Sequence, residues 1–199
     1  MATSNTVNSP AERLLAAAAK LFVRHGIRAV GIERLIAEAG VARASLYQSF
    51  GSKDELIAAY LDRQDALDRA AWQRAAANAG DDPVDRALLL FDLAESSARK
   101  RRYRGCLYLN AATEFPDPRH PAAAAIARHR AWVTDLLSEL LADAGVHAVD
   151  ETVAAVQLLY DGALAGSKLS KSTAPIVRAR DMARRTIADA LADRRDGRS

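Results

Sequence analysis

The chain is poor in the features that stabilise extracellular or membrane-embedded folds. Its 199 residues include one cysteine, Cys106, which excludes an intramolecular disulfide framework and fits a reducing cytosol. No apolar run approaches the roughly 20 residues that a membrane-spanning helix requires. The N-terminal segment MATSNTVNSP also lacks the basic stretch followed by an apolar stretch that marks a signal peptide. We therefore expect a soluble, cytoplasmic protein that does not contact a membrane.

Sequence motifs of the common enzyme classes are missing as well. The chain has no nucleophile elbow, no phosphate-binding loop, no HExxH and no paired-cysteine zinc pattern, so we expect neither catalysis nor a bound metal or cofactor. The enzymatic alternative is a thiol hydrolase in which Cys106 acts with His120 or His129, and only the presence of these residues supports it. A thiol titration that shows an ordinary Cys106 and no labelling burst would argue against this alternative.

The residues that are abundant favour helices. The chain has 44 alanines against 10 glycines and 6 prolines, and alanine is the best helix former. Half of the residues are hydrophobic, which suffices for a core, and no segment alternates apolar and polar residues as a half-buried strand does. The net charge of +3 is compatible with binding nucleic acid but does not by itself indicate it.

Helix start and stop signals divide the chain into about nine segments. Ser9 and Glu12 form a capping box that starts the first helix, and Gly26 ends that helix. A second capping box, SKDE at residues 52–55, opens a long helix whose apolar stripe includes Leu67. The predicted helices span residues 10–25, 32–39, 42–49, 53–78, 83–103, 105–114, 120–144, 148–168 and 173–194. The predicted fold is all-α, with an N-terminal three-helix helix-turn-helix domain and a C-terminal helical bundle.

Two short helices joined by a tight turn occupy residues 31–56, GIERLIAEAGVARASLYQSFGSKDEL. Gly40 suits the turn, which needs a residue comfortable at positive φ, and the layout is that of a helix-turn-helix. Leu35 and Leu46 are expected to be buried beneath the two helices. The opposite face of the second helix carries Arg43, Ala44, Ser45, Tyr47 and Gln48. Small side chains let a helix enter the major groove, and Arg and Gln hydrogen-bond base edges or phosphates.

Lys53 lies in the first turn of the long helix, where the helix dipole disfavours a cation by about 0.3–1 kcal/mol. Asp54 and Glu55 partly offset this cost. A phosphate docked on the helix N-terminus would make the lysine favourable. The spacing alone supports two interpretations of Lys53 equally well: it contacts a DNA phosphate, or it is a solvated surface lysine.

Residues 9–57 resemble the TetR family of regulators. The resemblance lies in the segment GVARASLYQSFGSKDEL. The residues that match the family pattern are Gly40, Val41, Leu46, Tyr47, Phe50, Lys53, Glu55 and Leu56. The resemblance implies a DNA-binding domain over residues 9–57 and a ligand-binding and dimerisation domain over residues 58–199. The implied DNA contacts are Arg43, Ser45, Tyr47, Gln48 and Lys53. It also implies a homodimer on a palindromic operator, acting as a repressor that a small-molecule effector releases, with activation as the open alternative.

Three positions depart from the pattern of that family. Gly31 stands where the family often has a capping threonine that also touches phosphate, and Ala42 replaces a frequent capping serine. Gln48 occupies a position that is often histidine or another aromatic residue. These differences bear on operator sequence and affinity rather than on the class of protein.

The segment RGCLYLNAATEFPDPRHP, residues 104–121, resembles more weakly the parts of TetR-like C-terminal domains that line or gate a ligand pocket. The candidate effector-binding residues are Phe91, Cys106, Tyr108, Asn110, Phe115, Trp132 and Tyr160. The alternative is that these side chains are simply core. Cations near Cys106 suit a redox-sensing thiol, although a buried structural cysteine is more common. These cations are Arg99, Lys100, Arg101, Arg102 and Arg104.

The last two predicted helices are the expected dimer surface. One apolar stripe comprises Val153, Val156, Leu159, Tyr160 and Ala163, and the other comprises Ile176, Met182, Ile187 and Leu191. Two such helices from each subunit can build a four-helix bundle. The alternative is that both stripes serve only the core of their own subunit. A third functional hypothesis, a helix-turn-helix protein without a ligand, is disfavoured by the length of the C-terminal portion.

Overall fold

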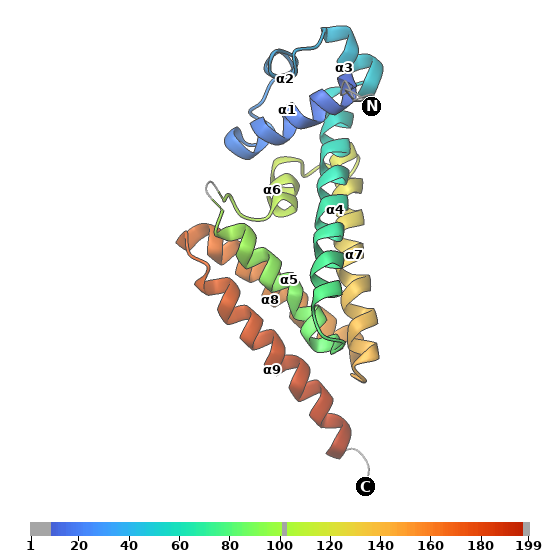
Figure 1. Ribbon diagram of the computed structural model, residues 1–199, viewed down its shortest axis with the longest axis vertical. Coiled ribbons are helices and arrows are strands. Elements are labelled where there is room, and N and C mark those ends of the chain that lie inside the picture. The colour runs from blue at the N-terminus through green and yellow to red at the C-terminus, as the bar shows by residue number, and fades with distance from the viewer. Residues whose placement is uncertain (1–8, 101–102, 197–199) are drawn as a thin grey trace, which may run out of the picture. The chain divides into compact units, whose positions relative to one another are not determined.

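The computed structural model describes residues 9–100 and 103–196, with side chains up to residue 192 (Figure 1). Every regular element in these ranges is an α-helix, and the nine helices found there confirm the predicted all-α fold. The helices are α1 Pro10–His25, α2 Ile32–Ala39, α3 Arg43–Phe50, α4 Lys53–Asn78, α5 Pro83–Ala98, α6 Leu107–Glu114, α7 Pro121–Asp143, α8 Val149–Ser170 and α9 Ala174–Asp196. None of the described helices is both long enough and apolar enough to cross a membrane.

Side-chain caps start two N-terminal helices as the sequence predicts. The Ser9 hydroxyl accepts a hydrogen bond from the Glu12 N–H at 3.2 Å, and the Ser52 hydroxyl accepts one from the Glu55 N–H at 3.1 Å. Each bond satisfies one of the backbone donors that a helix N-terminus leaves without a partner. The Glu12 carboxylate accepts a hydrogen bond from Arg63 at 2.7 Å, which ties α1 to α4.

The prediction of a helix over residues 83–103 is wrong at its C-terminal end, because α5 stops at Ala98. The Arg99 N–H still donates to the Glu95 carbonyl at 3.0 Å, and the helix ends there. The run RKRRYR at residues 99–104 would place like charges on neighbouring turns of a longer helix. Such pairs destabilise a helix, which explains the earlier end.

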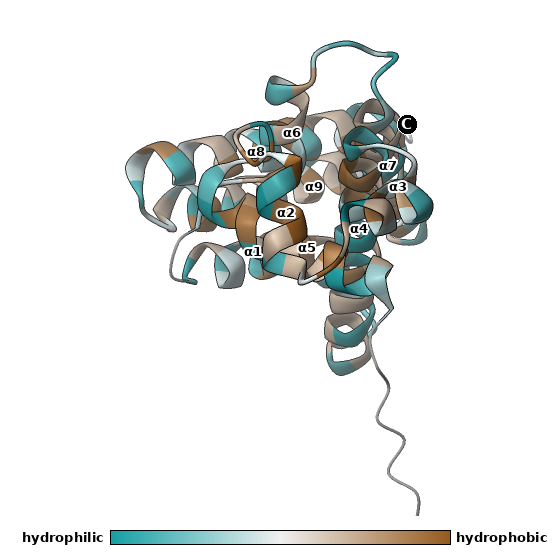
Figure 2. Ribbon diagram, turned by 90° about the horizontal axis from the view of Figure 1, so that it is seen from above, coloured by the Kyte–Doolittle hydropathy of each residue, from teal (hydrophilic) through white to brown (hydrophobic). Residues whose placement is uncertain are grey.

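The helices form two compact units. The first unit extends to Asp65 and includes Tyr108–Ala127, and the second contains Ala66–Leu107 and the chain from Arg128 onward. α1, α2 and α3 therefore lie in the first unit, α5, α8 and α9 lie in the second, and α4 and α7 contribute to both. Figure 2 shows hydrophilic and hydrophobic residues together on individual helices, as expected for helices that bury one face.

The first unit is built around the buried face of α1. Leu21 and Phe22 are each 3% exposed, and the Phe22 ring meets the Tyr60 ring of α4 edge-on, at 5.2 Å between centroids. Leu35 of α2 and Leu46 of α3 are 0% exposed, which confirms the burial predicted for both. This core holds the two short helices against α1 and the start of α4.

The buried stripe of α4 is shorter than the sequence predicts. Leu56, Ile57 and Leu61 are 0% exposed, but Leu67 is 52% exposed. Helical periodicity indicates which face of a helix is buried, and not how far its partners extend along it. Leu67 lies just beyond Asp65, where the part of α4 in the first unit ends.

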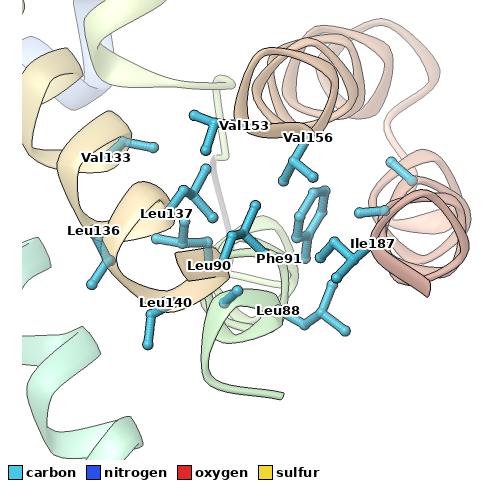
Figure 3. Packing of buried hydrophobic residues seen from close by; sticks show 14 of the residues in the cluster. Leu88, Leu90, Phe91, Val133, Leu136, Leu137, Leu140, Val153, Val156 and Ile187 are labelled. Carbon is cyan, nitrogen blue, oxygen red and sulfur yellow. The ribbon is translucent and has the colours of Figure 1, made fainter. Parts of the chain in front are cut away.

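Four helices supply the core of the second unit, shown in Figure 3. The members labelled there are Leu88, Leu90 and Phe91 from α5, Val133, Leu136, Leu137 and Leu140 from α7, Val153 and Val156 from α8, and Ile187 from α9. Full burial of a side chain of this size contributes about 1.5–3 kcal/mol. The cluster is therefore the main interaction that holds these four helices together.

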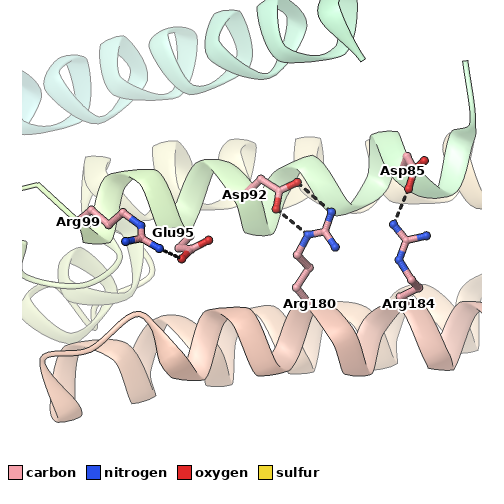
Figure 4. Close-up of polar contacts among 6 residues, drawn as sticks. All are labelled: Asp85, Asp92, Glu95, Arg99, Arg180 and Arg184. Atoms are coloured by element: carbon pink, nitrogen blue, oxygen red, sulfur yellow. Dashed lines mark hydrogen bonds and ion pairs between the residues drawn. The ribbon is translucent and has the colours of Figure 1, made fainter. Parts of the chain in front are cut away.

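Two ion pairs join α5 to α9 beside this core (Figure 4). Arg180 donates to the Asp92 carboxylate from Nε at 2.6 Å and from Nη2 at 3.2 Å, and Arg184 pairs with Asp85. All four side chains are partly exposed, so each pair stabilises the fold by at most about 1 kcal/mol. They pair successive turns of α9 with α5 in antiparallel order, Arg180 with Asp92 and Arg184 with Asp85.

The apolar stripes expected to form a dimer surface are buried in the core of their own chain. Val153, Val156, Ile176 and Ile187 are 3% exposed or less. This burial fits the alternative in which the stripes serve their own core, and the dimer surface on the last two helices stays a prediction, because periodicity shows that a helix face is buried but not against what. The large apolar side chains that α8 and the described side chains of α9 expose are Leu158, Leu169, Val177 and, from the predicted stripe, Met182.

Replacement of Gly40 by alanine should destabilise the protein by about 1–2 kcal/mol, since its φ of +61° is left-handed. Steric contact adds nothing, because the nearest atom to an added Cβ is Arg13 Nη1 at 4.0 Å. Urea unfolding followed by circular dichroism measures the loss. The control Gly80→Ala, at a site with open space and no positive φ, should change stability by less than about 0.5 kcal/mol. Equal stability of the two variants would contradict this role of Gly40.

Candidate nucleic-acid interface

The turn between α2 and α3 is built on Gly40, which adopts the left-handed conformation that the sequence predicts. The Val41 N–H donates to the Ile36 carbonyl and the Gly40 N–H to the Ala37 carbonyl, both at 3.3 Å, and this pair of bonds is a Schellman motif. From α1, Arg13 Nη1 donates to the Gly40 carbonyl at 3.2 Å. The turn is thus closed by its own backbone and held by α1.

α3 buries one side in the first unit and exposes the other. Leu46 is 0% exposed and Tyr47 is 43% exposed. The accessible residues that we call the α3 face are Arg43, Ala44, Tyr47, Gln48 and Ser49. Four of the five contacts predicted on this helix therefore lie on the α3 face, while Ser45 is half-buried. Ser49, in the last turn of α3, is also exposed, although it was not among the predicted contacts.

Neither α2 nor α3 has a side-chain cap at its N-terminus. Gly31 precedes α2 and Ala42 precedes α3, and neither side chain offers an oxygen to the first N–H groups of the helix. In α3 the Ser45 N–H donates to the Ala42 carbonyl at 3.0 Å, so only the N–H groups before it can turn to another acceptor. A phosphate is a favourable one, because the helix dipole attracts negative charge to a helix N-terminus.

Arg43 is held on the α3 face by two neighbours. Its guanidinium pairs with Glu33 of α2 and lies 5.9 Å from the centroid of the Tyr47 ring. The hydrogen bond to Tyr47 and the charge of Glu33 raise the pKa of Arg43. The paired side chains are 60% and 74% exposed, so the ion pair is weak. Arg43 can therefore exchange Glu33 for a phosphate or a base edge at little cost.

Lys53 begins α4, and its side chain is half-buried rather than fully solvated. Its ammonium donates to the Arg28 carbonyl at 3.5 Å, in the loop between α1 and α2. Burial lowers the pKa of Lys53, whereas the charges of Asp54 and Glu114 act to raise it. The lysine is thus oriented by the loop before α2.

Glu114 and Arg28 are candidate functional residues that the sequence analysis missed. They are 86 residues apart, yet the Arg28 N–H donates to the Glu114 carboxylate at 2.6 Å. No periodicity or short motif indicates a contact between a loop and the end of a distant helix. Because the Arg28 carbonyl receives Lys53, this contact adjoins the lysine predicted to bind phosphate.

The residues predicted to bind an effector fall into both compact units. Tyr108, Asn110 and Phe115 belong to the first unit, where Tyr108 is 7% exposed. Phe115 stacks on His120, with 4.4 Å between ring centroids. The candidates that belong to the second unit are Phe91, Cys106, Trp132 and Tyr160. The structure therefore does not gather all of these residues in one unit.

The candidates of the second unit pack within or against its core. Phe91 is 0% exposed and meets the Tyr160 ring edge-on at 5.3 Å between centroids. Burial raises the pKa of the Tyr160 hydroxyl, and the nearby Cys106 raises it further. The Arg69 guanidinium lies over the Trp132 ring, 5.0 Å from its centroid. These four side chains thus combine aromatic surface with a few polar groups.

Cys106 is half-buried against the core of the second unit. A Cβ added to the neighbouring Gly105 would lie 2.8 Å from Lys168 Cδ, so the stem of the lysine passes close to this backbone. Arg101 and Arg102, two of the cations expected near the thiol, lie outside the described residues. The structural and the redox-sensing interpretations of Cys106 both stay predictions.

His120 caps a helix. Its Nδ1 accepts a hydrogen bond from the Ala122 N–H at 3.1 Å, and its Nε2 lies 3.5 Å from Asp54 Oδ1. Both ring nitrogens are therefore engaged within the first unit. Cys106 belongs to the second unit.

Comparison with known proteins gives this arrangement its context. Residues 14–60 match the family described as bacterial regulatory proteins, tetR family. A solved TetR-family transcriptional regulator from Streptomyces coelicolor is 35% identical, with a TM-score of 0.78, and the match covers 94% of this chain and 96% of that one. The chain belongs to the TetR family. It is therefore a DNA-binding transcriptional regulator whose N-terminal helices form the helix-turn-helix domain.

Two further structures share the fold of this TetR-family chain. A TetR transcriptional regulator from Streptomyces avermitilis is 33% identical, with a TM-score of 0.74, and the match covers 88% of this chain and 98% of that one. NemR of E. coli, solved in its reduced form, is 24% identical, with a TM-score of 0.76. The match covers 90% of this chain and 98% of the NemR chain. No curated protein sequence matches the chain.

Removal of the carboxylate that competes for Arg43 should strengthen DNA binding. We expect Glu33→Gln to raise affinity about two- to fivefold, corresponding to the weak exposed ion pair. Glu38→Gln is the matched control, because it removes the same charge from α2 while Glu38 pairs with Lys20 instead. Fluorescence anisotropy with labelled duplex DNA measures both. An equal gain from the two variants would show that Arg43 is not involved.

Proposed function

We propose that this protein is a ligand-responsive repressor that binds a palindromic operator as a homodimer and is released by a small-molecule effector. The observation that carries the DNA-binding part is the α3 face, which presents Arg43, Tyr47 and Gln48 to solvent while Leu46 anchors the helix from behind. Lys53 stands at the start of the following helix. The alternative is that the bound protein activates transcription from the promoter instead of repressing it.

The residues of α3 suit different tasks at the DNA. Ala44 allows close approach of the helix to the floor of the major groove, where Gln48 can read an adenine through two hydrogen bonds. Arg43 can bind a guanine or a phosphate once it leaves Glu33. Tyr47, Lys53 and the half-buried Ser45 are assigned to phosphate contacts, which position the protein on the duplex.

The proposed dimer uses the outward faces of α8 and α9. Leu158 and Leu169 are 75% and 84% exposed, and Val177 and Met182 are each 41% exposed. Exposed apolar side chains on two neighbouring helices favour burial against a second copy. Two helices from each subunit would then form a four-helix interface about a two-fold axis, which matches the symmetry of a palindromic operator.

The proposed effector response is a population shift. A ligand that binds best to a dimer whose recognition helices are no longer about 34–36 Å apart lowers the affinity for operator. Of the predicted effector-binding residues, we assign this role to those of the second unit, Phe91, Cys106, Trp132 and Tyr160, which pack within or against one core. α4 and α7 each contribute residues to both units, so the chain links the effector-binding residues to the DNA-binding helices through these two helices.

We also infer that the protein is not an enzyme and acts in the cytoplasm. TetR-family proteins are transcriptional regulators, and the ring nitrogens of His120 are engaged by Ala122 and Asp54. Chromosomal DNA, the proposed partner, lies in the bacterial cytoplasm.

Substitution of both Tyr47 and Lys53 by alanine should weaken operator binding at least about tenfold, because two phosphate contacts are lost. A gel-shift titration against an operator duplex measures the change. The double variant Gln73→Ala with Lys171→Ala removes one exposed polar and one exposed cationic side chain from the second unit, and we expect it to bind normally. Unchanged affinity of the first variant in a folded dimer would contradict the assignment of α3 to DNA.

Introduction of a charge on the outward face of α8 should dissociate the dimer. We expect Leu158→Asp to shift the protein to monomer in sedimentation velocity, because a buried unpaired carboxylate opposes association. Leu67→Asp is the control, since Leu67 is 52% exposed on α4, outside the proposed interface. A dimer that persists in the Leu158 variant would exclude this face as the interface.

A further inference from the structure

Glu114, the last residue of α6, binds the backbone of the loop between α1 and α2. Its Oε2 accepts the Arg28 N–H at 2.6 Å, and its Oε1 accepts the Ile27 N–H at 3.4 Å. Hydrogen bonds to an ionised carboxylate are roughly twice as strong as neutral ones. Ile27 itself is 2% exposed, so its side chain anchors the loop from the other side. The carboxylate therefore fixes the loop where it leaves α1.

The Arg28 side chain also binds Glu114. Its Nη1 donates to the backbone carbonyl of Glu114 at 3.1 Å. That carbonyl lies at the C-terminus of α6, where carbonyls lack helical partners and the helix dipole favours a cation. We call these three hydrogen bonds the Glu114 clamp. They join Glu114 to Ile27 and Arg28, which lie 87 and 86 positions earlier in the chain.

The Glu114 clamp lies directly beside Lys53. The Arg28 carbonyl accepts a hydrogen bond from Lys53 Nζ at 3.5 Å. The clamp binds the N–H and the guanidinium of Arg28, so it holds the residue whose carbonyl receives Lys53. Lys53 is half-buried, which limits the other positions that its ammonium can take.

The same stretch of chain also holds the residue that follows Lys53. Nε2 of His120 lies 3.5 Å from Asp54 Oδ1, and the His120 ring stacks on Phe115. Residues 114–120 therefore contact both the loop that receives the Lys53 ammonium and the first turn of α4. All of these residues belong to the first unit.

We propose that Glu114 is a positioning residue for DNA binding, which holds Lys53 at the DNA phosphate by fixing the Arg28 carbonyl. This inference rests on the proposed contact between Lys53 and DNA. A carboxylate that acted only through its charge would repel phosphates, so its removal would strengthen binding. Positioning predicts the opposite sign, because a displaced Lys53 loses its phosphate contact.

The test measures the dissociation constant of the full-length protein for a duplex recovered by selecting genomic fragments on the wild-type protein, at several salt concentrations. Glu114→Gln should weaken binding about five- to tenfold and reduce the slope of log K against log salt by about 1, as expected for one lost phosphate contact. Glu114→Asp keeps the charge but shortens the side chain, and it should weaken binding too. Asp117→Asn removes the same charge from the α6–α7 loop outside the clamp, and it should change affinity by less than about twofold.

A double-mutant cycle separates positioning from a general loss of structure. In a Lys53→Gln background, Glu114→Gln should change affinity by less than about twofold, because the contact on which it acts is already gone. Unchanged or tighter binding by the Glu114 variants, or an undiminished effect in the Lys53→Gln background, would overturn the proposal. Should the glutamine variant fail to fold, the aspartate variant decides the matter.

The outcome also distinguishes this inference from the proposed function on which it rests. A wild-type protein that selects and binds no duplex would overturn both. A wild-type protein that binds, with Glu114 variants that bind equally well, would overturn only the role of Glu114.

Discussion

Burial of Leu46 is the constraint on which the recognition surface depends. α3 is eight residues long, and Leu46 is the residue that it buries. Removal of such a side chain from a core typically costs about 2–5 kcal/mol. Together with the Schellman turn at Gly40 and the hydrogen bond from Arg13, this burial sets the rotation of a helix too short to be stable alone. The α3 face is exposed because Leu46, on the opposite side of the helix, is buried.

Arg43 and Lys53, the two cations proposed to bind DNA, each depend on a carboxylate for their position, in different ways. Arg43 shares an exposed, weak ion pair with Glu33, which a phosphate can replace. Lys53 is half-buried and is held through the backbone of Arg28, which Glu114 fixes. With a net charge of only +3, the chain lacks a strong general attraction to DNA. Affinity must therefore depend on the placement of individual cations.

Much of the fold and of the α3 face could be predicted from local signals, and the remainder depends on contacts that are distant in sequence. Caps, glycine stops and helical periodicity indicated the all-α fold, and Gly40 with the buried Leu46 indicated the outward face of α3. Periodicity could not show that Val153 and Val156 face their own core while Leu158 is exposed. The Glu114 clamp was missed because nothing local marks a carboxylate that binds a loop 86 residues earlier.

The central claim is that the α3 faces of two subunits read one symmetric DNA site, and selection of genomic fragments by the purified protein tests it most directly. We expect enrichment of a short palindromic sequence. The centres of its two half-sites should lie about 10 base pairs apart, which is one helical turn, or a multiple of that distance. The neighbouring genes would then suggest the effector. Enrichment of no sequence, or of a sequence without two-fold symmetry, would contradict the account.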